Sequence, residues 1–301
     1  MQRLQRRAAR AAAVPCLWLI AAAVAAQPTP ADDRQAQASA ARDAAIQVAR
    51  NGPQDVALGA QAVLHLPAGE TFIPQPQAQA LLHAMGNPGD DPNLHGLIFP
   101  RAPEGHWFMT VRWEPAGYVK DDDAKDWNAD DMLQQFRDGT AEANKERAKM
   151  GVPGLELVGW ARRPAYDAER HRLVWAMSLR EVDAPAGAPR DVNYNTYALG
   201  REGYFSLNMI AAEAELEALM PVAEAQLAAL QFHDGKRYAD FDAKTDHVAE
   251  YGLAALVVGV AAKKLGFIAM AGLFLAKFAK VILIGLAALG AAFTKFFRRK
   301  T

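Results

Sequence analysis

The sequence predicts an α+β fold with a mainly antiparallel sheet and flanking helices, followed by a C-terminal hydrophobic membrane helix or helical hairpin. Neighbouring strand-like segments lie between helix-like segments, which favours antiparallel pairing over alternating βαβ units. Residues 265–294 carry only two charges, Lys277 and Lys280. The chain is 51% hydrophobic and 22% charged, which excludes a chain that is disordered throughout.

The N-terminus has the pattern of a secretory signal peptide over residues 1–26. Four arginines precede an uncharged run from residue 11 to residue 26, and Val24-Ala25-Ala26 offers small residues for cleavage before Gln27. An uncleaved N-terminal anchor is the alternative, although the run is short for a span. Cys16, the only cysteine, lies in this run, so a cleaved chain has no disulfide and no thiolate metal site.

Residues 247–301 form the predicted membrane-anchoring segment. The uncharged runs 265–276 and 281–294 are each shorter than the roughly 20 residues of an upright span, but together they suffice for one tilted helix. A helical hairpin, interfacial amphipathic helices and a buried soluble helix remain alternatives. The basic cluster at 296–300 suits the cytoplasmic side of a membrane. We therefore expect the body of the chain to lie outside the cytoplasm and to be held at a membrane by this segment.

The charge distribution separates the two ends from the body. The net charge of −1 divides into +4 for residues 1–26, −12 for residues 27–246 and +7 for residues 247–301. An acidic body lacks the phosphate-binding charge on which nucleic-acid binding depends, so we expect no nucleic-acid partner. The expected partners are the membrane, through residues 247–301, and a protein.

The predicted body begins after an Ala-, Gln- and Pro-rich linker, residues 27–54, which contains one short helix at 36–50. Helices are expected at 76–85, from an N-cap at Asn128 to Gly151, and at 213–229, where Pro221 falls inside. Strands are expected at 62–66, 106–114, 156–162, 170–182, 192–199 and 204–210. A turn is expected at 164–169, and residues 200–203 should close a hairpin.

Several segments resemble a known family. These are Gly117-Tyr118-Val119-Lys120-Asp121-Asp122-Asp123, Asn144-Lys145-Glu146-Arg147, Gly159-Trp160, Tyr194-Asn195-Thr196, Gly235-Lys236-Arg237-Tyr238-Ala239-Asp240-Phe241 and the tail from Tyr251 to Gly266. Together, over about residues 55–297, they resemble a family of bacterial membrane-anchored proteins known as domain of unknown function 2167. The resemblance implies a bacterial membrane protein without an assigned activity and assigns no catalytic residue. Together with the signal-like N-terminus, it leads us to expect an inner-membrane protein whose main domain, 55–246, lies in the periplasm.

The acidic loop 121–126 is the obvious candidate metal site. An EF-hand loop that began at Asp121 would need Gly at its sixth position and Glu at its twelfth, where Asp126 and Met132 stand. The seven histidines show no zinc spacing either. We therefore expect a solvated loop that caps the following helix, and no cofactor.

A group of aromatic and hydrogen-bonding residues near turns and strand ends is the candidate binding site. Such residues can line a groove or can be core aromatics with capped polar tips. The group comprises Tyr118, Lys120, Asp121, Asp123, Trp127, Trp160, Tyr194, Asn195, Arg201 and Asn208.

These features favour a membrane-anchored envelope protein that acts as a binding or interaction module. The three serines, at positions 39, 178 and 206, lie in no nucleophile elbow, so we predict no catalytic residue. Two alternatives remain: a cation-dependent envelope enzyme that uses the acidic loop 121–126, and a membrane-active protein that acts through its C-terminal helices.

Overall fold

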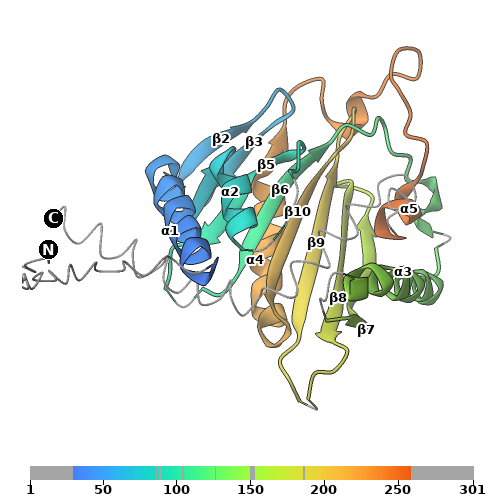
Figure 1. Cartoon of the computed structure of the whole chain (residues 1–301). Helices are drawn as coiled ribbons and strands as arrows, with labels where there is room; N and C mark the ends of the chain where they lie inside the picture. The colour runs from blue at the N-terminus through green and yellow to red at the C-terminus, as the bar shows by residue number, and fades with distance from the viewer. Residues whose placement is uncertain are drawn as a thin grey trace, which may run out of the picture.

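The computed structural model describes residues 30–258, except 86, 88–89, 104, 126, 150–152 and 186 (Figure 1). The predicted signal peptide 1–26 and the predicted membrane segment beyond residue 258 lie outside the described residues. No helix among the described residues combines the length and the apolarity that crossing a bilayer requires.

The described part of the chain is built on an eight-stranded antiparallel sheet, the main sheet, which confirms the predicted α+β class. Its strand order is β1-β4-β5-β6-β10-β9-β8-β7, so the late strand β10 lies in the middle. The strands are β1 Arg50–Asn51, β4 Glu70–Pro74, β5 Leu94–Pro100, β6 Phe108–Glu114, β7 Leu155–Asp167, β8 Arg172–Glu181, β9 Asp191–Leu199 and β10 Tyr204–Ala212.

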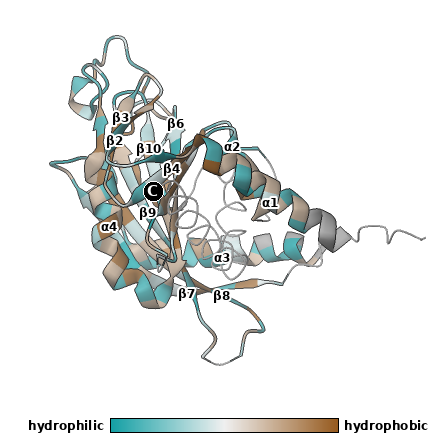
Figure 2. Cartoon of the chain, turned by 90° about the vertical axis from the view of Figure 1, so that its left-hand side faces the viewer, coloured by the Kyte–Doolittle hydropathy of each residue, from teal (hydrophilic) through white to brown (hydrophobic). Residues whose placement is uncertain are grey.

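One face of the main sheet packs against a helix and a second, smaller sheet. The helix is α4 Leu216–Ala229, and the small sheet has the order β11-β3-β2, with β11 Leu230–Phe232, β3 Ala62–Leu66 and β2 Gln54–Leu58. Met109, Phe205 and Leu64 meet in the core between these layers and are fully buried. Figure 2 shows α4 on the opposite side of the main sheet from α1, α2 and α3.

The other face, which we call the helical face, carries helices at its two ends. Helices α1 Pro30–Val48 and α2 Gln77–Ala84 pack on the β4–β5 end, where Leu81 and Leu97 are buried. Helices α3 Ala129–Lys149 and α5 Leu253–Val258 pack at the other end, where α3 contacts the edge strand β7 and where Met132 and Leu173 are buried. A further small cluster, Leu155, Leu157 and Leu179, lies under α3. The helical face therefore has separate apolar clusters at its two ends rather than one continuous core.

Most predicted elements are found close to their predicted bounds. Asn128 accepts the Asp130 backbone N–H at 2.9 Å and so caps α3, as predicted. The predicted turn at 164–169 is wrong in part, because β7 continues through Pro164 to Asp167. This strand is at the edge of the sheet and shifts register three times against β8, and edge strands and bulges are where proline is tolerated.

The helix expected at 36–50 starts earlier, at Pro30, and belongs to the packed structure. Ala45 is fully buried in the cluster that α1 shares with α2. The three-residue helix η2 Glu213–Glu215 begins the segment predicted as one helix, and α4 runs through Pro221.

Candidate functional site

Three segments that are far apart in sequence meet beside α5. They are residues 117–123, 235–241 and 246–254, and we call their meeting point the C-terminal junction. The backbone of Tyr118 pairs with the third segment, donating to the His247 carbonyl at 2.8 Å and accepting from the Ala249 N–H at 2.9 Å. The chain is thereby fixed to the domain shortly before the predicted membrane segment continues beyond the described residues.

Asp123 caps the start of α5. Its two carboxylate oxygens accept the backbone N–H groups of Leu253 and Ala254, at 3.0 and 3.1 Å. These are the first N–H groups of the helix, which have no acceptor within it. Gly252 permits this approach, since a Cβ there would lie 2.5 Å from an Asp123 oxygen. Leu253 and Val257 are almost fully buried, so α5 is part of the folded domain.

An aromatic stack joins the first two segments of the junction. The ring of Tyr118 lies between those of Tyr238 and Phe241, with centroids 4.4 and 3.8 Å away. The Tyr238 hydroxyl donates to the Val119 carbonyl at 2.9 Å. Burial, together with the neighbouring Tyr118 hydroxyl, raises the pKa of Tyr238 far above its ordinary value, so this hydrogen-bond donor stays protonated.

Asp121 belongs to a second polar contact at the rim of the junction. It accepts the Tyr166 hydroxyl at 2.7 Å, and the same hydroxyl oxygen lies 3.1 Å from His171 Nδ1. A phenol has one proton, which Tyr166 gives to Asp121, so the contact with His171 requires a proton on Nδ1. Burial, and then Asp121, raise the pKa of Tyr166 and keep that proton in place. The His171 ring also stacks on Tyr238, 4.1 Å between centroids.

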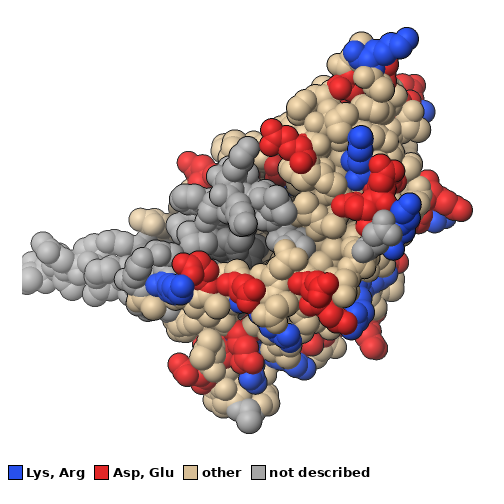
Figure 3. Space-filling model, turned by 90° about the vertical axis from the view of Figure 1, so that its right-hand side faces the viewer, with Lys and Arg blue, Asp and Glu red and all other residues tan. Residues whose placement is uncertain are grey.

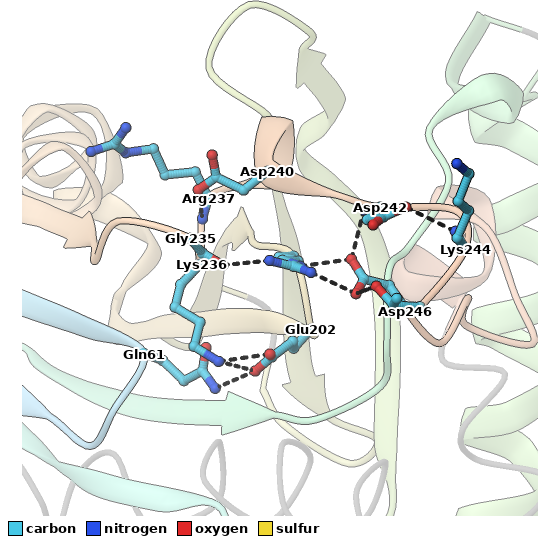
Figure 4. Close-up of polar contacts among 11 residues, drawn as sticks. Gln61, Glu202, Gly235, Lys236, Arg237, Asp240, Asp242, Lys244 and Asp246 are labelled. Atoms are coloured by element: carbon cyan, nitrogen blue, oxygen red, sulfur yellow. Dashed lines mark hydrogen bonds and ion pairs between the residues drawn. The ribbon is translucent and has the colours of Figure 1, made fainter.

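Ion pairs on the other side of the junction join residues 201–202 to its second and third segments. Arg201 donates from Nε and Nη2 to the two oxygens of Asp246, at 2.7 and 2.8 Å. This paired geometry holds the pKa of Asp246 well below its usual range. Beside it, Glu202 accepts from Lys236 at 2.6 Å and from Gln61 at 2.8 Å (Figure 4). The β9–β10 hairpin is thus tied both to the C-terminal segment and to the small sheet.

The predicted acidic loop does not cap the helix that follows it. Asn128 performs that role, whereas Asp123 caps α5 and Asp121 binds Tyr166. Within the described ranges, no three His, Cys, Asp or Glu side chains gather in a way that could hold a metal ion. Through Asp121 and Asp123, the loop connects segments that are distant in the sequence.

The other predicted binding residues lie in different places. Lys120 is exposed. Trp127 and Trp160 pack against the same apolar cluster, and the Trp160 indole N–H donates to the Ala129 carbonyl at 2.9 Å. Tyr194 is buried on the opposite face of the main sheet, with Arg162 and Glu224 at its hydroxyl. Asn195 and Asn208 face each other across β9 and β10. The structure therefore gives Tyr118, Asp121, Asp123 and Arg201 contacts within the junction. Lys120 lies in the same segment with an exposed side chain, Trp127 and Trp160 pack against the apolar cluster beneath the junction, and the remaining residues lie elsewhere.

Sequence reasoning missed Tyr166, His171, Tyr238 and Asp246 at the junction. Tyr238 stands in one of the segments that carry the family resemblance, so it could have been selected. His171 has a left-handed backbone, with φ of 51°, in the β7–β8 turn. Histidine adopts that conformation only occasionally, and nothing in the sequence marks it.

The surface around α3 and α5 carries both signs of charge. Figure 3 shows Asp and Glu side chains interspersed with Lys and Arg over this side of the molecule. A surface of this kind produces no extended field of one sign, so it does not indicate a polyanionic or polycationic partner.

Comparison with known proteins gives a family but no activity. No curated protein matches the chain. Among solved structures, cyanobacterial PsbP (CyanoP) from Synechocystis sp. PCC 6803 shares 10% identity with a TM-score of 0.36, over 60% of this chain and 92% of that one. A family described as "Protein of unknown function (DUF2167)" matches residues 50–290. The chain belongs to this family of unknown function, as its sequence segments predicted.

Proposed function

We propose that the chain is a membrane-tethered binding module of the bacterial envelope. In this proposal residues 1–26 direct export, the domain faces the periplasm, and the apolar segment that follows α5 enters the inner membrane. The domain binds a protein partner and performs no reaction of its own.

The observation that carries the proposal is the C-terminal junction. Tyr118 and Asp123 hold the backbone of residues 247–254 against the domain. The last described helix, α5, is packed rather than free, and the apolar stretch 265–294 begins seven residues after its end at Val258. A tether that starts on a rigid body sets the height and orientation of that body above a membrane, which a flexible linker does not do.

The experiment compares the full chain with a chain that ends after Val258. This cut keeps α5, since removing Leu253 and Val257 would expose core surface. Both proteins are expressed with the signal-like N-terminus, and membranes are washed with alkaline carbonate. We expect the full chain to pellet and the shortened chain to be released as a folded periplasmic protein. A shortened chain that still pellets would place the anchor in an uncleaved N-terminus.

Export is tested separately with a reporter that is active only in the periplasm, fused after Val258. Activity supports the proposed location. Activity of a cytoplasm-specific reporter at the same position instead would reject it, whatever the outcome of the membrane wash.

A further inference from the structure

A partly buried carboxyl group lies where the helical face meets the C-terminal junction. Glu114 is the last residue of β6, and Trp113 before it packs against the core on the opposite face of the main sheet. Because successive side chains of a strand point to opposite faces, Glu114 lies on the helical face. The chain then enters the first segment of the junction, where the Tyr118 backbone binds the His247 carbonyl. Glu114 therefore stands at the strand end from which the junction is built.

Two tyrosines connect Glu114 to the chain that leads into α5. Tyr204 of β10 stands opposite Glu114 in the strand register and is buried. Its hydroxyl group is hydrogen-bonded to that of Tyr251, which belongs to the third segment of the junction and lies just before α5 begins at Leu253. Burial raises the pKa of Tyr251, and the negative charge of Glu114 raises it further. The segment that leads into α5 therefore lies within electrostatic range of Glu114.

The other polar groups around Glu114 come from the loop between α2 and β5 and from the neighbouring strands. Asn93 of that loop donates from Nδ2 to Glu114 Oε2 at 2.7 Å. Asp91 of the same loop is paired with Arg112 of β6. Across the sheet, Tyr197 of β9 is a further titratable side chain on which the charge of Glu114 acts. Glu114 thus has a hydrogen-bond donor, while the cation nearest to it on its own strand is already paired with Asp91.

These surroundings favour the neutral form of Glu114. Burial, and then the neighbouring Asp91, raise the pKa of Glu114 from 4.5 to about 7, whereas Arg112 and the hydrogen bond from Asn93 oppose this. A carboxyl group whose pKa is higher in the packed state favours packing in its protonated form. Its contribution is complete below pH 4.5 and is lost as the pH rises through about 7.

We propose that Glu114 makes the packing of the C-terminal segment, residues 246–254, depend on pH. While Glu114 is protonated, Tyr251 and the residues that lead into α5 stay packed on the domain. When Glu114 ionises, opening of this segment lets water reach the carboxylate, so the open arrangement gains population. The inference rests on the proposed function, because the segment is the proposed tether, and it adds that alkaline pH loosens the domain from that tether.

The test follows hydrogen exchange of the Ala249 and Leu253 amides in the full chain in detergent, in a pH series that includes pH 6 and pH 8. Each rate is divided by the intrinsic rate at the same pH, so that only the opening of the segment is compared. We expect the protection factors to fall several-fold from pH 6 to pH 8, at most about tenfold, the limit that applies when opening returns Glu114 fully to water. In Glu114→Gln the fall should be absent, because an amide does not ionise.

Two further variants keep the test decisive. Glu70→Gln is the matched control, because it removes another buried carboxyl group with a pKa of about 7, which binds Gln226 of α4 on the opposite face of the main sheet. The fall in protection at the junction should remain in this variant. Asn93→Ala removes the donor that favours ionised Glu114, so the midpoint of the fall should move to higher pH. It decides the question if Glu114→Gln does not fold.

Four outcomes overturn the proposal: wild-type protection factors that agree within about twofold at pH 6 and pH 8, an equal fall in Glu114→Gln, loss of the fall in Glu70→Gln, or an unmoved midpoint in Asn93→Ala. An equal fall in Glu114→Gln would assign the pH dependence to another group at the junction, such as His171 or His247. The carbonate wash measures whether the chain is anchored and not how its last segment packs, so failure of this inference is distinguishable from failure of the tethered-module proposal.

Discussion

Glu70 should make the stability of the domain fall as pH rises above 5. Its carboxylate accepts from Gln226 Nε2 between β4 and α4, and the two residues are 8% and 0% exposed. Burial raises the pKa of Glu70 from 4.5 to about 7, and the hydrogen bond from Gln226 only partly opposes this. Gln226 Oε1 is buried without a partner among the described residues, so a protonated Glu70 has an acceptor within the pair.

The sign of the effect follows from the direction of the pKa change. A carboxyl whose pKa is higher in the folded chain favours folding in its protonated form. Its contribution is fully present below pH 4.5 and declines as pH rises to about 7. With about 1.4 kcal/mol for each tenfold change in proton affinity, the ionised group costs the folded state about 3 kcal/mol, of which about 2 to 3 kcal/mol is lost between pH 5 and pH 8.

Glu70→Gln removes this dependence, because an amide does not ionise and can both donate to and accept from Gln226. We expect the free energy of unfolding of the variant, relative to wild type, to rise by about 2 to 3 kcal/mol from pH 5 to pH 8. Urea unfolding of both proteins at the two pH values measures it, and the difference cancels other titrating groups. The same relative stability at both pH values would refute the reasoning.

Two other substitutions test the packing of the fold. Gly203→Ala should prevent folding or destabilise the domain by several kcal/mol in thermal melts, because φ is 157° there and a Cβ would lie 2.0 Å from the Glu114 carbonyl oxygen. Gly159→Ala is the control, because a Cβ there would have no atom within 4 Å, and its melting temperature should be close to that of the wild type. Tyr166→Phe should cost about 1 kcal/mol by removing the hydroxyl that binds Asp121 and His171, and an unchanged melting temperature would show that this contact contributes nothing.

The sequence predicts a strand well when its two faces differ in polarity or in packing, because its residues then alternate. In β6 the alternation placed Met109, Val111 and Trp113 together, and all three lie in one core cluster. In β5 both Leu97 and Ile98 are fully buried, on opposite faces of the main sheet. Such a strand has no alternation to detect, which is why β5 was not predicted.

The junction could not be predicted for a different reason. Its contacts join residues far apart in sequence: Asp123 caps Leu253, 130 residues away, and Tyr238 reaches Val119, 119 residues away. Local reasoning assigns an acidic run to solvent or to the next helix, since no local signal identifies a distant N–H as its partner. The predicted group of binding residues is divided between the junction and other sites for the same reason.

Hydrogen exchange at the C-terminal junction tests the central claim most directly, namely that the residues leading into the hydrophobic segment are held on the domain. In the full chain, the amides of Ala249, Leu253 and Ala254 should be protected. Asp123→Ala should accelerate exchange at Leu253 and Ala254 about five- to tenfold, as expected for loss of a cap worth about 1 kcal/mol. Ala249, bound to the Tyr118 backbone, should be unaffected.

Asp122→Ala is the matched control, because this neighbouring side chain is exposed and the cap is left intact. Protection of Leu253 and Ala254 that is unchanged in Asp122→Ala and reduced in Asp123→Ala is the predicted result. Fast exchange at all three amides in the wild type would contradict the account, because the segment would then be free of the domain.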